Sequence, residues 1–134
     1  MRAMPEPITG RSMRRAEFDK IVRSALERVP EMFRAAMQNV QIVVKDWPDP
    51  DLMEEMTGDR DTVVYGLFTG RALTERHYDD WGDLPAVISI YQRPLEEDFP
   101  DRRDLEREIE ITLVHEIAHY MGISEDTLAS YGYG

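Results

Sequence analysis

Residues 104–126, which read DLEREIEITLVHEIAHYMGISED, decide the fold of this chain. Their apolar side chains recur three and four positions apart, which is the spacing of one face of an α-helix. The spacing predicts a long helix over about residues 104–121, capped by Asp101 or Asp104. The predicted buried side of this helix consists of Leu105, Ile109, Leu113, Ile117 and Tyr120 or Met121.

Residues 115–119 of this helix have the pattern H-E-x-x-H, formed by His115, Glu116 and His119. Residues four apart lie on one helix face, so both imidazoles can bind the same metal ion. Two histidines leave positions on Zn²⁺ open, and a neighbouring carboxylate can take a proton from a bound water. The pattern therefore predicts a catalytic zinc site with His115 and His119 as ligands and Glu116 as general base. The alternative is a surface turn with two solvated histidines.

The residues after the motif predict how a third ligand reaches the metal. They extend the pattern to H-E-x-x-H-x-x-G-x-x-E, in which Gly122 can end the helix because glycine accepts positive φ. One established zinc pattern places its third ligand three residues after such a glycine, and that residue here is Glu125. Only fifteen residues follow His119, which is too few for a separate ligand-bearing helix. We predict Glu125 as the third ligand, with Asp126 as the substitute if the turn is one residue longer.

Other side chains are weaker candidates for the site. His77 is a conceivable ligand, although a lone loop histidine is usually exposed. Tyr131 or Tyr133 could donate a hydrogen bond to an oxyanion, although such tyrosines more often pack against the fold. Glu108 lies two turns before His115 and is expected to be solvated. A cluster of loop acids could bind calcium, but its spacing matches no calcium loop; its members are Asp79, Asp80 and Asp83.

The rest of the chain predicts an α+β layout. Residues 1–12 are expected to form a flexible tail and residues 13–134 a single domain. The expected elements are helices at 14–29 and 30–37, strands at 40–45, 63–68 and 86–92, a helical turn at 52–56, a polar loop at 70–84, a chain break at 94–100 and a short helix at 124–129. We expect the sheet to pack on both the first helix and the metal helix. The strand from Val87 to Tyr91 is the candidate edge strand, to which an extended peptide could add. An ordinary interior strand is an equal alternative.

Composition limits the classes of partner. A chain of 134 residues fits one domain, and the absence of cysteine excludes disulfides and thiolate ligands and suits a cytoplasmic location. The net charge of -11 repels phosphate backbones, so nucleic acid is not the expected partner. No apolar run is long enough to span a bilayer, so no membrane partner is expected either.

The chain resembles the small bacterial minimal-zincin proteins, also called matrix-metalloprotease-like domains, over about residues 17–133. The resemblance rests on residues 18–22, 65–70, 72–76, 84–91 and 115–128, of which the last segment is the most specific. It implies a compact α+β zincin-like fold, with a small mixed sheet packed on an N-terminal helix and an active-site helix. It also implies a metal site at His115, His119 and Glu125, where family members often carry aspartate in the third position.

Together these features predict a zinc-dependent metallopeptidase that acts on a peptide or protein substrate. Glu116 would take a proton from the metal-activated water and pass it to the leaving amine. The alternative function is a non-catalytic module in which the same ion stabilises a protein-interaction domain. The intact Glu116 favours the enzyme, because a purely structural site does not need a general base.

Overall fold

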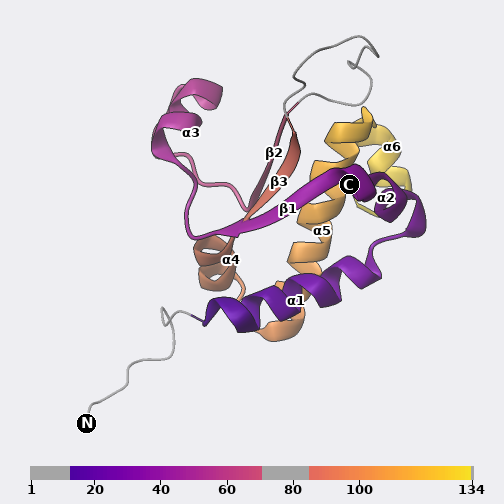
Figure 1. Cartoon of the computed structure of the whole chain (residues 1–134), viewed down its shortest axis with the longest axis horizontal. Helices are drawn as coiled ribbons and strands as arrows, with labels where there is room; N and C mark the ends of the chain where they lie inside the picture. The colour runs from indigo at the N-terminus through magenta and orange to yellow at the C-terminus, as the bar shows by residue number, and fades with distance from the viewer. Residues whose placement is uncertain (1–12, 71–84, 134) are drawn as a thin grey trace.

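The computed structural model describes residues 13–70 and 85–133. Its elements are, in chain order, α1 (Arg15–Arg28), α2 (Glu31–Ala36), the 3₁₀ turn η1 (Met37–Asn39), β1 (Val40–Lys45), α3 (Pro50–Thr57), β2 (Gly66–Thr69), β3 (Ala86–Tyr91), α4 (Gln92–Asp98), α5 (Arg102–Met121) and α6 (Glu125–Ser130). A small sheet lies beside the helices (Figure 1), so the α+β prediction is confirmed. The predicted tail at 1–12 and most of the predicted loop at 70–84 lie outside the described residues. In the described part of the chain, no helix is both long and apolar enough to cross a membrane.

Helix α5 organises the fold. Its N-cap is Asp101, whose side chain accepts hydrogen bonds from the backbone N–H groups of Arg103 and Asp104 at 2.9 and 3.2 Å. Such a cap satisfies amides that have no partner within the helix. The helix contacts α1, α2 and α4 as well as strands β2 and β3. Its buried residues include the predicted Leu105, Ile109, Leu113, Ile117 and Tyr120.

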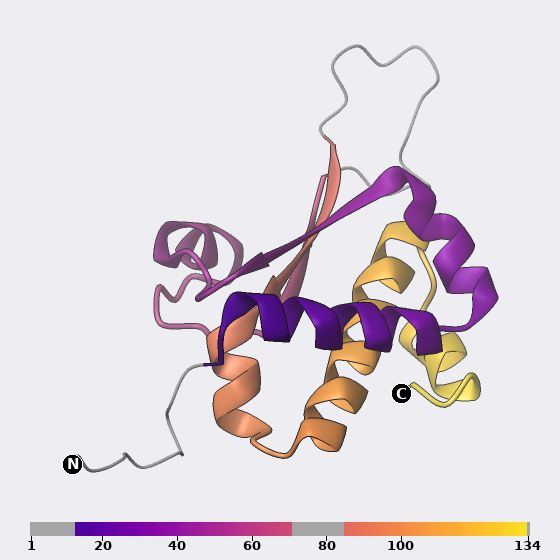
Figure 2. The same ribbon diagram turned by 60° about the horizontal axis from the view of Figure 1, so that its bottom comes forward.

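The N-terminal helix α1 packs chiefly on α5, and the two helices cross in both ribbon views (Figures 1 and 2). Phe18, Ile21 and Ala25 on α1 are almost completely buried in the shared core. Along its other side α1 faces β1 across a shallow groove that Val22 and Ile42 help to line. The helix predicted from the apolar stripe is therefore confirmed, with α5 rather than the sheet as its main partner.

Within the described residues, three strands form a sheet in the order β1-β3-β2. Strand β3 is parallel to β1 and antiparallel to β2, so the sheet is mixed as the resemblance implied. The prediction that Val87 to Tyr91 forms an edge strand is wrong, because this strand is central. Its nearly continuous burial is typical of a strand covered on both faces. The edge strand that contacts α5 is β2, which begins three residues later than predicted.

The predicted chain break at residues 94–100 is also wrong, because α4 begins at Gln92 and continues to Asp98. Pro94 is the third residue of this helix. The first four N–H groups of a helix have no intrahelical acceptor, so a proline in the first turn removes no hydrogen bond. Pro94 and Leu95 are instead buried against the core.

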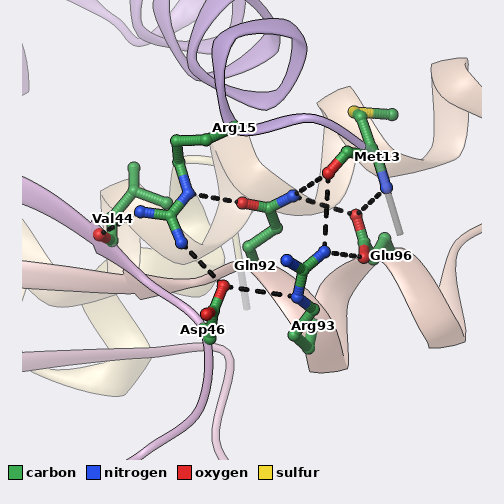
Figure 3. Close-up of polar contacts among 7 residues, drawn as sticks. All are labelled: Met13, Arg15, Val44, Asp46, Gln92, Arg93 and Glu96. Atoms are coloured by element: carbon green, nitrogen blue, oxygen red, sulfur yellow. Dashed lines mark hydrogen bonds and ion pairs between the residues drawn. The ribbon is translucent and has the colours of Figure 1, made fainter.

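A polar network joins the starts of α1 and α4 to the end of β1 (Figure 3). The guanidinium of Arg15 donates to the Gln92 side chain at 2.6 Å, the Val44 carbonyl at 3.0 Å and the Asp46 carboxylate at 2.7 Å. The Gln92 side chain, which is fully buried, donates in turn to the Met13 carbonyl at 2.8 Å. Because a buried amide without partners is costly, the network fixes where α1 begins relative to the sheet.

Candidate metal centre

The residues of the H-E-x-x-H pattern lie in the last two turns of α5. His115 and Glu116 are half-buried, whereas His119 is exposed. The helix backbone alone places the two imidazoles on one face, as predicted. Each of the three side chains then has a distinct environment supplied by the rest of the fold.

Glu116 is held by the edge strand. Its Oε1 atom accepts a hydrogen bond of 2.7 Å from the backbone N–H of Phe68 on β2. Burial raises the pKa of Glu116, while the bond from Phe68 and the nearby imidazoles of His119 and His115 act in the opposite direction. The carboxylate thus lies close enough to both imidazoles to interact with them electrostatically. A general base must lie within hydrogen-bond reach of the water it deprotonates, and Glu116 stays the predicted base.

His119 packs against the same strand. The centroid of its ring lies 5.6 Å from that of Phe68, whose ring also contacts Tyr120 at 5.5 Å. The buried Phe68 side chain therefore packs against the His119 ring, at a tilt of 54° between the two ring planes. The contact limits the rotation of an otherwise exposed imidazole.

His115 has a different partner. Its Nε2 atom lies 2.5 Å from the backbone carbonyl oxygen of Tyr133. The Tyr133 hydroxyl donates a 2.7 Å hydrogen bond to the buried Glu110 carboxylate. The prediction that Tyr133 could donate to an oxyanion is not met in this geometry, because its hydroxyl points at Glu110. Tyr131 is exposed and rests edge-on against Phe33, at 5.9 Å between ring centroids.

The chain reverses after α5 as predicted. Gly122 caps the helix with φ 77° and ψ 26°, in the left-handed region that favours glycine. The N–H of Ile123 bonds to the Ala118 carbonyl at 2.9 Å, which closes the turn. Ser124 then caps α6, where Glu125 is the first residue.

The turn does not by itself settle the third ligand. Glu125 and Asp126 are both exposed. Across residues 13–70 and 85–133, no three His, Cys, Asp or Glu side chains gather closely enough to hold an ion. Glu125 therefore stays a prediction, with Asp126 as its alternative. His77 and the loop acids Asp79, Asp80 and Asp83 lie outside the described residues.

A surface cleft of about 370 Å³ opens beside the motif. One wall is the approach to β2 and the other is α5; the lining residues are Val64, Tyr65, Gly66, Glu108, Ile111, Thr112, His115 and Glu116. Glu108, expected to be solvated, is half-buried at one end of this cleft. The cleft brings an accessible, partly apolar surface directly to the predicted general base.

Gly66 and Phe68 are site residues that the sequence did not reveal. A Cβ atom on Gly66 would lie 2.5 Å from Cγ2 of Thr112, so only glycine lets β2 approach α5 this closely. A glycine within a strand is a recognised sign of such an approach. Phe68 contributes a backbone N–H, which every residue other than proline has, so no sequence signal could have identified it.

Comparison with known families identifies the family of this chain. A family model described as zincin-like metallopeptidase matches residues 37–133, from η1 to the end of the described chain. The chain belongs to the zincin-like metallopeptidase family. A search of curated proteins found no match. Membership in a metallopeptidase family implies a metal ion and a peptide or protein substrate, and zinc is the metal that zincins are named for.

The donors of this zincin-like chain fit zinc in type. Two imidazoles four residues apart on one helix, with a carboxylate close to both, are ligands and a base of the right chemistry. His115 and His119 would hold the ion. In the part of the chain that the structure describes, the Tyr133 carbonyl on Nε2 of His115 conflicts with this assignment.

Proposed function

We propose that this zincin-like protein is a zinc-dependent peptidase in which His115, His119 and Glu125 hold the metal and Glu116 is the general base. The observation that carries the proposal is the placement of Glu116, which follows His115 on α5 and whose carboxylate is fixed by a 2.7 Å hydrogen bond from a backbone amide of the edge strand. A carboxylate in a structural zinc site needs no such position.

A bound zinc ion would lower the pKa of its water and polarise the scissile carbonyl. Glu116 would accept a proton from the attacking water and donate it to the leaving amine. The hydrogen bond from Phe68 occupies one carboxylate oxygen, Oε1, and so leaves Oε2 for the proton. The bond also keeps the carboxylate from rotating, so the base is positioned before substrate binds.

The edge of β2 supports an extended peptide as the substrate. The N–H of Tyr91 on β3 bonds to the Tyr65 carbonyl, so residues 65, 67 and 69 direct their backbone groups toward β3. By the same alternation Gly66 and Phe68 direct theirs outward, as the bond from Phe68 to Glu116 demonstrates. The Phe68 N–H is already donated to Glu116, so the N–H and carbonyl of Gly66 and the carbonyl of Phe68 are the outward groups proposed to pair with an added strand of any sequence. The scissile bond of such a strand would lie beside Glu116.

The test is cleavage of a broad peptide mixture by fully zinc-loaded wild type and Glu116→Gln. The variant is expected to lose about 10²–10⁴-fold in rate, because glutamine cannot accept the proton. Its zinc affinity should stay close to that of the wild type. Glu55→Gln is the matched control, since Glu55 is an exposed glutamate on the distant helix α3.

The alternative function predicts a different pattern. For a non-catalytic, metal-stabilised interaction module, the zinc-loaded wild type cleaves nothing and Glu116→Gln changes neither partner binding nor stability. Equal cleavage by wild type and Glu116→Gln would also refute the proposed mechanism, because it would show that another group is the base.

A further inference from the structure

Nε2 of His115 is the ring nitrogen through which this residue would bind the metal, and it already has a hydrogen-bond partner. Nε2 lies 2.5 Å from the carbonyl oxygen of Tyr133. A carbonyl oxygen has no proton to give, so Nε2 must carry the hydrogen and donate it. A protonated ring nitrogen has no lone pair for a metal. Zinc would also need to lie about 2.0–2.1 Å from the same nitrogen, in the direction that the oxygen occupies.

The position of the Tyr133 carbonyl is fixed by specific contacts. The Tyr133 backbone N–H bonds to the Leu128 carbonyl at 3.1 Å, and its hydroxyl bonds to Glu110 at 2.7 Å. Its ring packs edge-on against Phe33, at 6.3 Å between centroids, and the Arg107 guanidinium lies 5.5 Å from its centre. Only 8% of Tyr133 is exposed, so the segment is docked in the core cluster rather than lying loosely on the surface.

We propose that the docked segment 131–133 is a built-in competitor of the metal ion. When Tyr133 is docked, its carbonyl blocks Nε2 of His115, and metal binding requires this contact to open. Docking of Tyr133 and binding of the metal are then coupled, and each weakens the other by the same free energy. Metal weakens the docking of Tyr133, and weaker docking strengthens metal binding. The inference rests on the proposed role of His115 as a ligand, but not on peptide hydrolysis.

The first test measures zinc affinity by competition with a chromophoric chelator, without any assay of activity. Tyr133→Ala removes the ring and hydroxyl that anchor the segment and should bind zinc about 5-fold or more tightly than the wild type, within the usual range of coupling between sites. Trp47→Ala is the control for loss of an aromatic ring, because Trp47 is an exposed residue between β1 and α3, outside the docked segment. It should change the affinity by less than about 2-fold, as a residue outside the coupled pair.

Tyr133→Phe covers the case in which Tyr133→Ala folds poorly. It keeps the ring and its packing and removes the hydroxyl that donates to Glu110. It should shift the zinc affinity in the same direction by a smaller factor. Melting curves without zinc establish that each variant is folded.

The second test observes the segment directly by hydrogen exchange. The amide of Tyr133 is bonded to Leu128, so it should exchange slowly without metal and faster after zinc is added. His115→Ala should abolish this response to zinc.

Unchanged or weaker zinc binding by Tyr133→Ala and Tyr133→Phe would overturn the inference while leaving the metal site intact. Such a result would mean that the His115 ring turns away from the carbonyl, or that Tyr133 supports the ligand. Failure of the wild type and both variants to bind zinc would refute this inference and the proposed function together.

Discussion

The backbone N–H of Phe68 on the edge strand donates a 2.7 Å hydrogen bond to the Glu116 carboxylate on helix α5. This bond connects the two elements on which the proposed function depends, the strand proposed to pair with substrate and the helix that carries the proposed base. The carboxylate is half-buried, so it depends on this partner more than a solvated one would.

Substitutions of Glu116 should therefore separate structural from chemical effects. Glu116→Gln retains an oxygen that accepts from Phe68, so its stability without metal should match that of the wild type. Glu116→Ala leaves the Phe68 N–H without its acceptor and should lose about 1–3 kcal/mol. Urea unfolding of the three proteins measures the difference. Equal stability of the alanine and glutamine variants would show that water replaces the carboxylate at no cost.

Gly122 should affect both stability and metal binding. Gly122→Ala places a side chain at a positive φ and should lower the free energy of unfolding by about 1–2 kcal/mol. Gly58→Ala is a matched control, because Gly58 also ends a helix with φ 84° and lies in open space away from the site. Both variants should lose similar stability in urea. Only Gly122→Ala should weaken zinc binding in chelator competition, since its turn carries Glu125. Equal zinc affinity in the two variants would contradict Glu125 as the third ligand.

Gly66→Ala should disturb the contact between β2 and α5. The new methyl group would lie 2.5 Å from Cγ2 of Thr112, so strand and helix must separate. We expect a loss of about 1–3 kcal/mol, as for other overpacked sites. Thr112→Ser deletes the clashing methyl but keeps the hydroxyl that donates to the Glu108 carbonyl. Adding it to Gly66→Ala should recover part of the stability. If the changes in unfolding free energy of the two single variants simply add up in the double variant, the clash lies elsewhere.

Tyr65, which lines the cleft, should titrate at unusually high pH. Its hydroxyl donates to Asp98 at 2.5 Å, and this bond, burial and the charges of Asp98 and Glu108 raise its pKa from 10.0 to about 12. The pKa of Tyr65 is higher in the folded than in the unfolded protein. The contribution of the protonated Tyr65 to folding stability is therefore fully present below pH 10.0 and is lost as the pH rises through about 12.

Ultraviolet absorbance of tyrosinate measures this titration, with Tyr65→Phe identifying the contribution of Tyr65. Asp98→Asn should bring the Tyr65 pKa back toward its ordinary value. If Tyr65 ionises near 10.0 in the wild type, the hydrogen bond to Asp98 is not formed in solution.

The core of the candidate site could be predicted from sequence because it depends on local geometry. His115, Glu116 and His119 share one side of the helix whenever residues 115–119 are helical. The spacing of the apolar residues in α5 predicts a helix here that buries one face. The end of the helix is equally local, because Gly122 reaches positive φ at little cost. These features need no knowledge of what packs against them.

The tertiary structure decided the partners of those residues. The order of the strands depends on long-range pairing, so similar apolar runs at β2 and β3 did not reveal which one lies at the edge. The bond from Phe68 to Glu116 joins residues 48 positions apart and uses a backbone group that leaves no trace in the sequence. The contact between Tyr133 and His115 likewise arises because Phe33 and Glu110 together hold the Tyr133 ring, and three elements that meet only in the folded core supply that arrangement.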